Sequence, residues 1–533
     1  MELTSDTVAV ENLLPAAIAL VRAEQTSKDY LRDREAWKQP IGMDETELGF
    51  LGATASGYIQ QQTKGQYPAP LVALEALLGA AGVDADAAAA IEVEQMSQLF
   101  GTPVNRALIN VFLLGDRNKK DRGIDEEDVQ PRKISSVSVV GAGIMGAGIA
   151  AANLKRGIPV ALADASAPAL AKGVTSVLEE ASYNKQLKGP DPVRTVQLAA
   201  MLNSATSDEE IARADLVVEE IVENLEVKRK LYARIERLLR PEAILGSNTS
   251  TIPITQLAAG LARPERFCGL HFFNPVRKMP LVEVIRGEHT NDETVATVVA
   301  YAKSIGKSPI VVNDGPGFLV NRLLLPYMNE SLELILEGAP IKDIDRVAKQ
   351  FGMPLGPIAL YDVVGIDTCV LAGRVMVEAF PERTVANPIP LTLLKKGRLG
   401  QKNGAGFFQY PRGAEKGVPD PEVDQLLAPL MREKRKFSDE ELTSRLFLPM
   451  VLEATRILEE KIVRDVRDVD LGLIYGLGFP PFKGGLLFWA DTLGAAKIVE
   501  MLKPFAELGP RATPTPLLLE MAKSGKKFYE LKI

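Results

Sequence analysis

Hydrophobic positions between residues 1 and 130 recur every three to four residues, a spacing that predicts amphipathic helices. Polar breaks separate the individual patterns, which are Leu13–Glu24, Glu45–Gln62, Pro70–Ala81 and Asp84–Leu99. A charged stretch from Gly115 to Pro131 then interrupts the hydrophobic positions, as is typical of a linker. We therefore predict that residues 1–130 form a helical linker segment without visible chemistry.

From Ile134 onward, short runs rich in β-branched residues alternate with segments of helical length and amphipathic pattern. The short runs are Val137–Val140, Pro159–Ala163, Leu216–Val218, Ala243–Leu245, Phe267–Leu270, Val282–Ile285 and Ile310–Val312. Strands that alternate with helices predict an α/β doubly wound domain, in which helices cover both faces of a parallel sheet. The strand pattern disappears after Gly317, so we assign residues 131–315 to this domain.

The remaining residues show helical patterns, and these patterns occur twice in the same order. Arg322-Leu-Leu-Leu-Pro326 begins the first copy, and Arg445-Leu-Phe-Leu-Pro449 begins the second copy 123 residues later. We predict two tandem all-α domains, residues 316–412 and residues 413–533, the second including a charged linker at its start. Two helical units that each leave an apolar face uncovered can pack together about a pseudo-two-fold axis, so we expect the second copy to mimic a dimer partner.

Composition narrows the class of protein. A hydrophobic content of 46% with 25% charged residues is typical of a soluble globular protein, and a net charge of -7 gives no indication of nucleic-acid binding. Cys268 and Cys369 are the only cysteines, which excludes a disulfide framework and a thiolate metal site and fits a reducing compartment. The sequence has neither a positively charged signal region nor an apolar run of membrane-spanning length, so we expect a cytoplasmic protein.

A glycine motif marks the start of the α/β domain. Gly141-Ala-Gly143-Ile-Met-Gly146 follows the first strand and opens a helix, the context in which such a loop binds the pyrophosphate of a dinucleotide in a Rossmann-type fold. Asp164 ends the next strand 18 residues after Gly146, where a carboxylate accepts hydrogen bonds from the adenine ribose and repels a 2′-phosphate. The motif therefore predicts NAD as the cofactor. A tight turn without a ligand is the alternative, and the accompanying strand, helix and aspartate disfavour it.

Only two histidines are available as acid/base groups. His271 directly follows a strand, and Glu283 lies 12 residues later on the next apolar run, so neighbouring elements can bring the two side chains together. Hydride transfer needs a group that accepts a hydroxyl proton near neutral pH, which favours His271 over His289 in its polar loop. The alternative is that His271 is a core residue beside Phe272 and Phe273.

A polar segment, Ser247–Thr251, follows another strand of the predicted sheet. It would lie at the carboxyl edge of the sheet, where ligands bind in this architecture. Serine and threonine are equally common as helix N-caps, so the local sequence fits either role.

These motifs together resemble the 3-hydroxyacyl-CoA dehydrogenase part of the bacterial fatty-acid oxidation complex α subunit. The segments that carry the resemblance are Gly141–Gly148, Glu219–Lys228, Ser247–Ile254, His271–Glu283, Val312–Arg322 and Gly400–Phe408. The resemblance implies NAD-dependent oxidation of (S)-3-hydroxyacyl-CoA to 3-ketoacyl-CoA in fatty-acid β-oxidation. It covers residues 131–410, and the second helical copy extends it to the C-terminus.

The resemblance also implies roles for individual residues. His271 would abstract the C3 hydroxyl proton while Glu283 orients its imidazole, and Ser250 and Asn321 would hydrogen-bond the substrate oxygen. Because Asn321 belongs to the first helical copy, that copy would be the catalytic one. The residues that would line the cofactor side are Glu223, Lys228, Asn248 and Asn274. Lys185 and Lys188 are candidates for binding coenzyme A, although a solvated helix end explains them equally well.

The N-terminus departs from the family. Only Val8–Leu14 resembles the end of the enoyl-CoA hydratase/isomerase domain that begins the family's α subunit, and residues 20–130 resemble the helical linker after it. We therefore expect that this chain does not hydrate enoyl-CoA. The family also implies a thiolase β subunit as a partner.

Two other functions fit parts of the sequence. One is a β-hydroxyacid dehydrogenase that acts on a free acid, and the other is a scaffold whose helical segments dock thiolase while the nucleotide fold is a relic. The combination of Ser250, His271, Glu283 and Asn321 favours oxidation of a thioester over both.

Overall fold

The computed structural model describes residues 7–411, 414, 416–432 and 435–532. The chain divides into two compact units, residues 1–106 and residues 107–533. Helix α6 (Pro103–Lys120) contains this division, so the larger unit begins before residue 130. Within the larger unit, Arg117 of α6 pairs with Asp465 and Asp468 at 3.3 and 2.7 Å. No helix of the described residues is long and apolar enough to cross a membrane.

The N-terminal unit is helical. After a short 3-10 turn (Val10–Asn12), its helices are α1 (Leu13–Ser27), α2 (Asp29–Trp37), α3 (Glu45–Thr63), α4 (Ala69–Ala80) and α5 (Ala85–Ser97). Asp44 and Asp84 cap α3 and α5 by accepting hydrogen bonds from backbone N–H groups of their first turns. The four predicted helices are confirmed, and α2 is an addition. Among residues 7–106 whose burial is described, only Gly52 and Ala81 are buried, so this unit has almost no core of its own.

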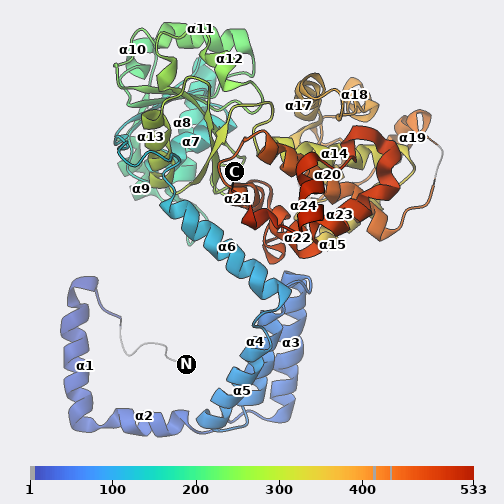
Figure 1. The fold of residues 1–533 in the computed structure, drawn as a ribbon. Coiled ribbons are helices and arrows are strands. Elements are labelled where there is room, and N and C mark those ends of the chain that lie inside the picture. The colour runs from blue at the N-terminus through green and yellow to red at the C-terminus, as the bar shows by residue number, and fades with distance from the viewer. Residues whose placement is uncertain (1–6, 412–413, 415, 433–434, 533) are drawn as a thin grey trace. The chain divides into compact units, whose positions relative to one another are not determined.

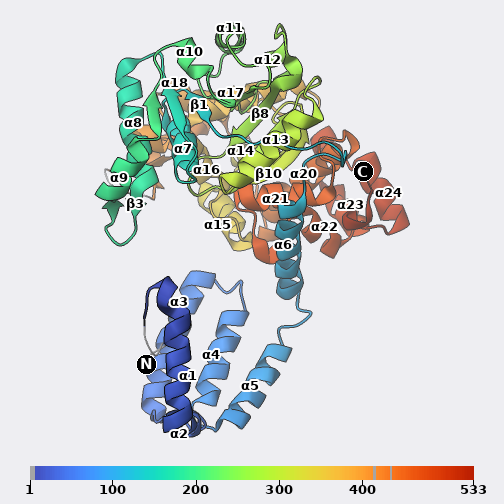
Figure 2. The same ribbon diagram turned by 90° about the vertical axis from the view of Figure 1, so that its left-hand side faces the viewer.

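The larger unit begins with an eight-stranded sheet covered by helices on both faces (Figures 1 and 2). The strands lie in the order β10-β9-β8-β7-β6-β1-β2-β5. Their bounds are β1 (Val137–Val140), β2 (Val160–Ala163), β5 (Leu202–Ser204), β6 (Leu216–Glu219), β7 (Ile244–Ser247), β8 (Phe267–Phe272), β9 (Leu281–Arg286) and β10 (Ser308–Asn313). The helices are α7 (Ile144–Leu154), α8 (Ala167–Ser182), α9 (Pro192–Ala199), α10 (Asp208–Ile211), α11 (Leu225–Ile235), α12 (Ile254–Ala258) and α13 (Asp292–Ser304). The predicted Rossmann-type fold is thus confirmed.

The prediction of a fully parallel sheet is wrong for two strands. β9 pairs antiparallel with β8, and β10 pairs parallel with β9, so both run opposite to the other six strands. A parallel connection needs about a dozen residues or more, and the loop 273–280 between β8 and β9 is shorter than that. The antiparallel register places His271 directly opposite Glu283. β5 was not predicted, nor was a small hairpin of β3 (Tyr183–Asn184) and β4 (Gly189–Pro190).

Two helical domains follow the sheet. The first contains α14 (Val320–Leu336), α15 (Ile341–Phe351), α16 (Pro357–Val364), α17 (Ile366–Ala379) and α18 (Pro388–Lys395). The second contains α20 (Asp439–Glu459), α21 (Val466–Leu477), α22 (Leu486–Leu493), α23 (Ala495–Leu502) and α24 (Pro516–Ser524). A short hairpin of β11 (Phe408–Gln409) and β12 (Val418–Pro419), which was not predicted, and α19 (Pro421–Leu427) lie between them.

The two helical domains pack on one another through α14 and α20 (Figure 1). Arg322 of α14 is buried and pairs with Glu453 of α20 and with Glu460 at the C-cap of that helix, each at 2.6 Å. The equivalent arginine of the second copy pairs with the equivalent glutamates of the first, namely Arg445 with Glu330 and Glu337, at 2.7 and 2.9 Å. Such reciprocal pairing is the pattern of an interface between two copies of one unit, in agreement with the predicted pseudo-two-fold packing.

Candidate active site

The glycine turn between β1 and α7 has the shape that a dinucleotide requires. Gly141 has a φ of 116°, and a Cβ atom there would lie 2.1 Å from the carbonyl oxygen of Glu220. A Cβ atom at Gly146 would lie 1.9 Å from the carbonyl oxygen of Gly141, so neither position accepts another residue. At Gly143, by contrast, nothing lies within 4 Å of the Cβ position. This open position leaves room for a ligand to approach the backbone.

The N-terminus of α7 and the end of β2 complete a site that fits NAD. Gly143 is the N-cap of α7 and no side chain caps the helix, so its first N–H groups can bind a pyrophosphate. Asp164 accepts hydrogen bonds from the backbone N–H groups of Ala142 (2.9 Å) and Ser166 (2.8 Å), one on each carboxylate oxygen. Each oxygen keeps a second acceptor position for a ribose hydroxyl. A carboxylate there disfavours the 2′-phosphate of NADP.

His271 and Glu283 form a buried pair across β8 and β9. Nδ1 of His271 lies 2.6 Å from Oε2 of Glu283. The other carboxylate oxygen accepts hydrogen bonds from the backbone N–H groups of Leu319 (3.1 Å) and Val320 (2.9 Å), at the start of α14. Glu283 therefore fixes the imidazole with one oxygen and the first helical domain with the other. Because Nδ1 faces Glu283, Nε2 is the nitrogen left for a substrate.

Aromatic rings enclose the imidazole of His271. The ring of Phe273 lies 4.5 Å from it and the ring of Phe318 lies 5.9 Å away, measured between centroids. Phe318 is fully buried and has a φ of 50°, a left-handed conformation that costs a non-glycine residue about 1–2 kcal/mol. This conformation lies in the turn that aims the N-terminus of α14 at Glu283.

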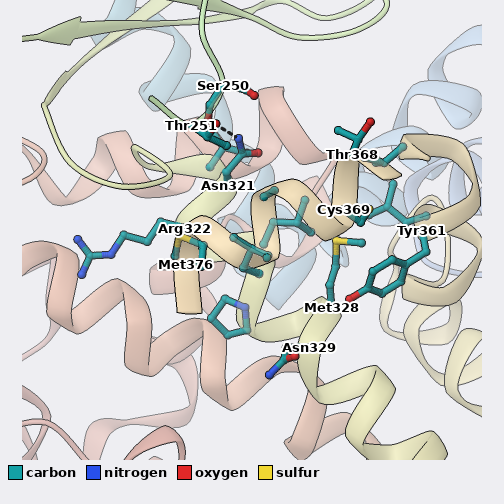
Figure 3. A pocket seen from close by; sticks show the side chains of 18 of the residues that line it. Ser250, Thr251, Asn321, Arg322, Met328, Asn329, Tyr361, Thr368, Cys369 and Met376 are labelled. Atoms are coloured by element: carbon teal, nitrogen blue, oxygen red, sulfur yellow. Dashed lines mark hydrogen bonds between the residues drawn. The ribbon is translucent and has the colours of Figure 1, made fainter. Parts of the chain in front are cut away.

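Ser250 and Asn321 meet at the same place although they come from different domains. Nδ2 of Asn321 donates a hydrogen bond of 3.1 Å to the carbonyl oxygen of Ser250, as Figure 3 shows. Glu223 holds the segment that follows β7, because its Oε1 accepts hydrogen bonds from the Thr249 hydroxyl (2.6 Å) and the Ser250 N–H (3.1 Å). The Glu223 carboxylate and the Asn321 amide therefore both hold this segment in place.

One cavity of about 1020 Å³ brings together six of the predicted site residues. Those that line it are Glu223, Asn248, Ser250, His271, Asn274 and Asn321. On the side of the first helical domain its lining is mainly apolar and includes Met328, Tyr361, Cys369 and Met376 (Figure 3). Gly373 of α17 also lines it, and nothing lies within 4 Å of its Cβ position. Polar groups thus gather at the sheet edge, and an apolar chamber extends into the helical domain.

Besides the three glycines, Asp164 and Glu283 described above, three further predicted residues do not line the cavity. Lys228 has only 1% of its side chain exposed, and its Nζ pairs with Glu219 at 2.7 Å and Glu223 at 3.3 Å. It therefore supports Glu223 from behind rather than lining the cavity. Lys185 and Lys188 lie in the turn between β3 and β4, and neither is among the described residues that line the cavity.

Glu220 lines the cavity and was not predicted. Its carboxylate accepts a hydrogen bond from Nδ2 of Asn248, and burial raises its pKa to about 7. The sequence signal was the doublet Glu219-Glu220 at the end of β6. Side chains alternate along a strand, so two adjacent glutamates cannot both point the same way. Here Glu219 is fully buried and Glu220 faces the cavity.

Comparison with protein families finds two matches in this unit. The NAD binding domain of 3-hydroxyacyl-CoA dehydrogenase matches residues 136–315, and the C-terminal domain of the same family matches residues 317–410. A similar curated protein is the fatty acid oxidation complex subunit alpha of Pseudomonas aeruginosa. It is 40% identical over 528 residues, which cover 98% of this chain and 74% of that protein.

Similar solved structures include 3-hydroxybutyryl-CoA dehydrogenase from Escherichia coli K12. That chain is covered completely, with 74% of this chain, 26% identity and a TM-score of 0.65. Another is the dehydrogenase part of multifunctional enzyme 1 from C. elegans, with 25% identity, a TM-score of 0.55 and coverage of 77% of this chain and 96% of that one.

Proposed function

Because the chain belongs to the 3-hydroxyacyl-CoA dehydrogenase family, we propose that the His271–Glu283 pair is the base of its NAD-dependent oxidation of (S)-3-hydroxyacyl-CoA to 3-ketoacyl-CoA in fatty-acid β-oxidation. The observation that carries this proposal is the register of β8 and β9. It sets a buried imidazole against a carboxylate at the edge of a cavity that extends from Met145 of the glycine motif into an apolar chamber.

His271 accepts the proton of the C3 hydroxyl on its free Nε2. The glycine turn and Asp164 would hold NAD, which would supply the hydride acceptor that turns the C3 alcohol into a carbonyl. Glu283 then lies beside an imidazolium, and its negative charge stabilises that cation. The hydrogen bonds from Leu319 and Val320 hold the carboxylate in the orientation that this role needs.

Ser250 and Asn321 act on the substrate oxygen. Partial negative charge develops on this oxygen while the proton and the hydride depart, and fixed donors nearby stabilise it. The Asn321 amide gives one N–H to the Ser250 carbonyl and retains a second N–H for the substrate. The acyl chain would extend into the apolar chamber beside α14 and α17.

The test compares His271 with the other histidine of the chain. NADH formation is measured with 3-hydroxybutyryl-CoA, 3-hydroxyhexadecanoyl-CoA and free 3-hydroxybutyrate. His271→Asn should lower kcat by about 10²–10⁴-fold, as loss of a general base does. His289→Asn is the matched control, because this side chain is exposed, and it should leave the rate unchanged.

The same assay separates the alternatives. Turnover of free 3-hydroxybutyrate alone would favour a β-hydroxyacid dehydrogenase, and no turnover of any of the three substrates would favour a scaffold. Equal rates for His271→Asn and the unchanged protein would refute the proposed base.

We propose in addition that the chain assembles with a thiolase β subunit. One observation supports this partner: the similar curated protein is named as a subunit of a complex. A thiolase would use the 3-ketoacyl-CoA that the proposed reaction forms. Co-purification of a co-expressed thiolase subunit by size exclusion would support the assembly, and separate elution would contradict it.

We also propose that the protein is located in the cytoplasm. Both cysteines are unpaired, which fits a reducing compartment.

We propose, finally, that these 533 residues do not hydrate enoyl-CoA. The described helices of residues 7–106 bury only Gly52 and Ala81, so they enclose no site for a thioester. Turnover of crotonyl-CoA by this chain would contradict the proposal.

A further inference from the structure

Glu220 is fixed to the glycine turn through its backbone. Its N–H donates a hydrogen bond of 2.8 Å to the carbonyl oxygen of Val140, the last residue of β1. Its own carbonyl oxygen occupies the space that a Cβ atom at Gly141 would need. The position of Glu220 relative to a bound pyrophosphate is therefore set by the fold.

The side chain of Glu220 continues toward the catalytic pair. Its carboxylate accepts a hydrogen bond from Nδ2 of Asn248, and Oδ1 of Asn248 accepts one of 2.6 Å from the N–H of Phe272. Phe272 is the neighbour of His271 on β8. One polar connection thus runs along the carboxyl edge of β6, β7 and β8, and Glu220 is its end in the cavity.

The strand order gives Glu220 a counterpart. β1 carries the glycine turn, β2 lies on one side of it and is followed by Asp164, and β6 lies on the other side and is followed by Glu220. A dinucleotide whose pyrophosphate lies at this turn extends one nucleoside to each side. Asp164 and Glu220 therefore present one carboxylate to each half of the ligand.

We infer that Glu220 is a positioning residue for the nicotinamide half of NAD. Its carboxylate accepts hydrogen bonds from the hydroxyls of the nicotinamide ribose and orients the Asn248 amide. The inference rests on the proposed function and deepens it.

The charges around Glu220 make this role depend on pH. Burial raises the pKa of Glu220, the Asn248 hydrogen bond and Lys228 of α11 lower it, and Glu219 of β6 and Glu223 of the following loop raise it, which together give a pKa of about 7. His271 of β8 lines the same cavity. Above this pKa the ionised carboxylate is a pure acceptor, and below it the protonated group loses acceptor capacity. The affinity for NADH should therefore fall as the pH falls through 7.

The experiment measures the dissociation constant of NADH by fluorescence between pH 6 and pH 8, without any thioester. The unchanged protein should bind NADH several-fold more weakly at pH 6 than at pH 8. Glu220→Ala should weaken binding about tenfold at pH 8, because it removes charged hydrogen bonds. Glu220→Gln keeps the shape of the side chain, and it should abolish the pH step.

Glu226→Gln is the matched control, since this exposed glutamate lies on α11 and its one ion pair within the described part of the chain is with Arg229. It should keep the affinity and the pH profile of the unchanged protein. If Glu220→Gln also keeps both while the enzyme oxidises 3-hydroxyacyl-CoA, this inference alone is overturned. A chain that fails to oxidise the thioester overturns the proposed function instead.

Discussion

The two helical domains share a sequence pattern and differ in what surrounds them. In the first, the N-terminus of α14 binds Glu283, Asn321 meets Ser250, and α17 lines the cavity with only Ile366 and Met376 buried. In the second, the helix at the place of α17 is α23, which is 8 residues long, whereas α17 has 14, and α23 packs against α24. The first copy therefore provides the catalytic amide and most of the chamber on the helical side, while the second copy packs against it and completes the lining with residues such as Pro449, Leu477 and Arg511.

The reciprocal ion pairs between the copies are symmetric, but the charges beside them differ at one pair of equivalent positions. Glu333 of α14 and Arg456 of α20 occupy equivalent places, 123 residues apart. Arg456 adds a third guanidinium around Glu453, which also pairs with Arg322 and Arg383. A duplicated unit can thus keep its mutual contacts and still become electrostatically different on its two sides.

The largest expected effect concerns this asymmetry. Arg445→Met leaves the buried Glu330 with one arginine, Arg511, whereas Arg322→Met leaves Glu453 with two. Breaking a buried ion pair costs about 3–5 kcal/mol, so Arg445→Met should lose that much free energy of unfolding and Arg322→Met clearly less. Urea unfolding of both variants measures the difference. Equal losses would mean that the extra arginines do not compensate.

Asn321 gives the next largest effect, and it concerns catalysis. Asn321→Ala removes a donor to the substrate oxygen and should lower kcat/KM about 100-fold. Ser444 is the equivalent residue of the second copy and lies buried away from the cavity. Ser444→Ala should therefore keep kcat/KM within about twofold of the value for the unchanged protein, since Ser444 does not contact the substrate. A comparable loss in both variants would remove the distinction between a catalytic and a supporting copy.

A smaller effect is expected for the apolar chamber of the first copy. Gly373→Phe fills open space beside α17, so the ratio of kcat/KM for 3-hydroxyhexadecanoyl-CoA to that for 3-hydroxybutyryl-CoA should fall about tenfold. Gly373→Ala adds one methyl group and serves as the control with an unchanged ratio. If the ratio stays constant with phenylalanine as well, the acyl chain does not enter this chamber.

The smallest expected effect is on the pH dependence of stability. It distinguishes two equivalent aspartates, Asp345 and Asp470, which cap the N-termini of α16 and α22. Asp345 accepts a hydrogen bond from the N–H of Ile358 at 2.9 Å, and Asp470 accepts one from Leu487 at 2.7 Å. Burial raises the pKa of Asp345 to about 6 and that of Asp470 to about 7. A raised pKa means that the folded state holds the proton more tightly, so stability falls as pH rises from about 4 to the folded pKa and is level above it.

Of the two caps, only Asp470 titrates between pH 6 and pH 7, and it shares this window with Glu220, whose pKa is also about 7. Asp470 should contribute at most about 1.4 kcal/mol of the loss across it, in the unchanged protein and in Asp345→Asn alike. Asp470→Asn should make the profile there less steep. Thermal midpoints at pH 5, 6, 7 and 8 measure both windows, and an equal slope in Asp470→Asn and in the unchanged protein would assign the slope to another group.

Much of this architecture could be predicted because it depends on local patterns. The helices of residues 1–106, the glycine turn and the duplicated helical domains each leave a periodicity or a motif in the chain. The meeting of His271 with Glu283 could be expected only as an opportunity between neighbouring elements. Its cause, the antiparallel pairing of β8 and β9, depends on the short loop 273–280, whose length was the available and unused signal.

Burial of charged residues was beyond the sequence. Lys228 carries the same chemistry in a cofactor site and in a buried ion pair, and only the packing of α11 against β6 decides between them. For Glu219 and Glu220, the alternation of a strand indicates that they differ, but the direction depends on which face of the strand the neighbouring helix covers.

Glu283 contacts both the imidazole of His271 and the N-terminus of α14, so the position of the first helical domain and the activation of the base are coupled. Should the first helical domain swing away from the sheet, the carboxylate would lose both backbone donors, and the imidazole would lose its fixed partner at the same moment. An enzyme in this open arrangement would then not oxidise its substrate. Hydrogen exchange at the Val320 amide should accordingly slow when substrate and cofactor bind, and an unchanged exchange rate would argue against such coupling.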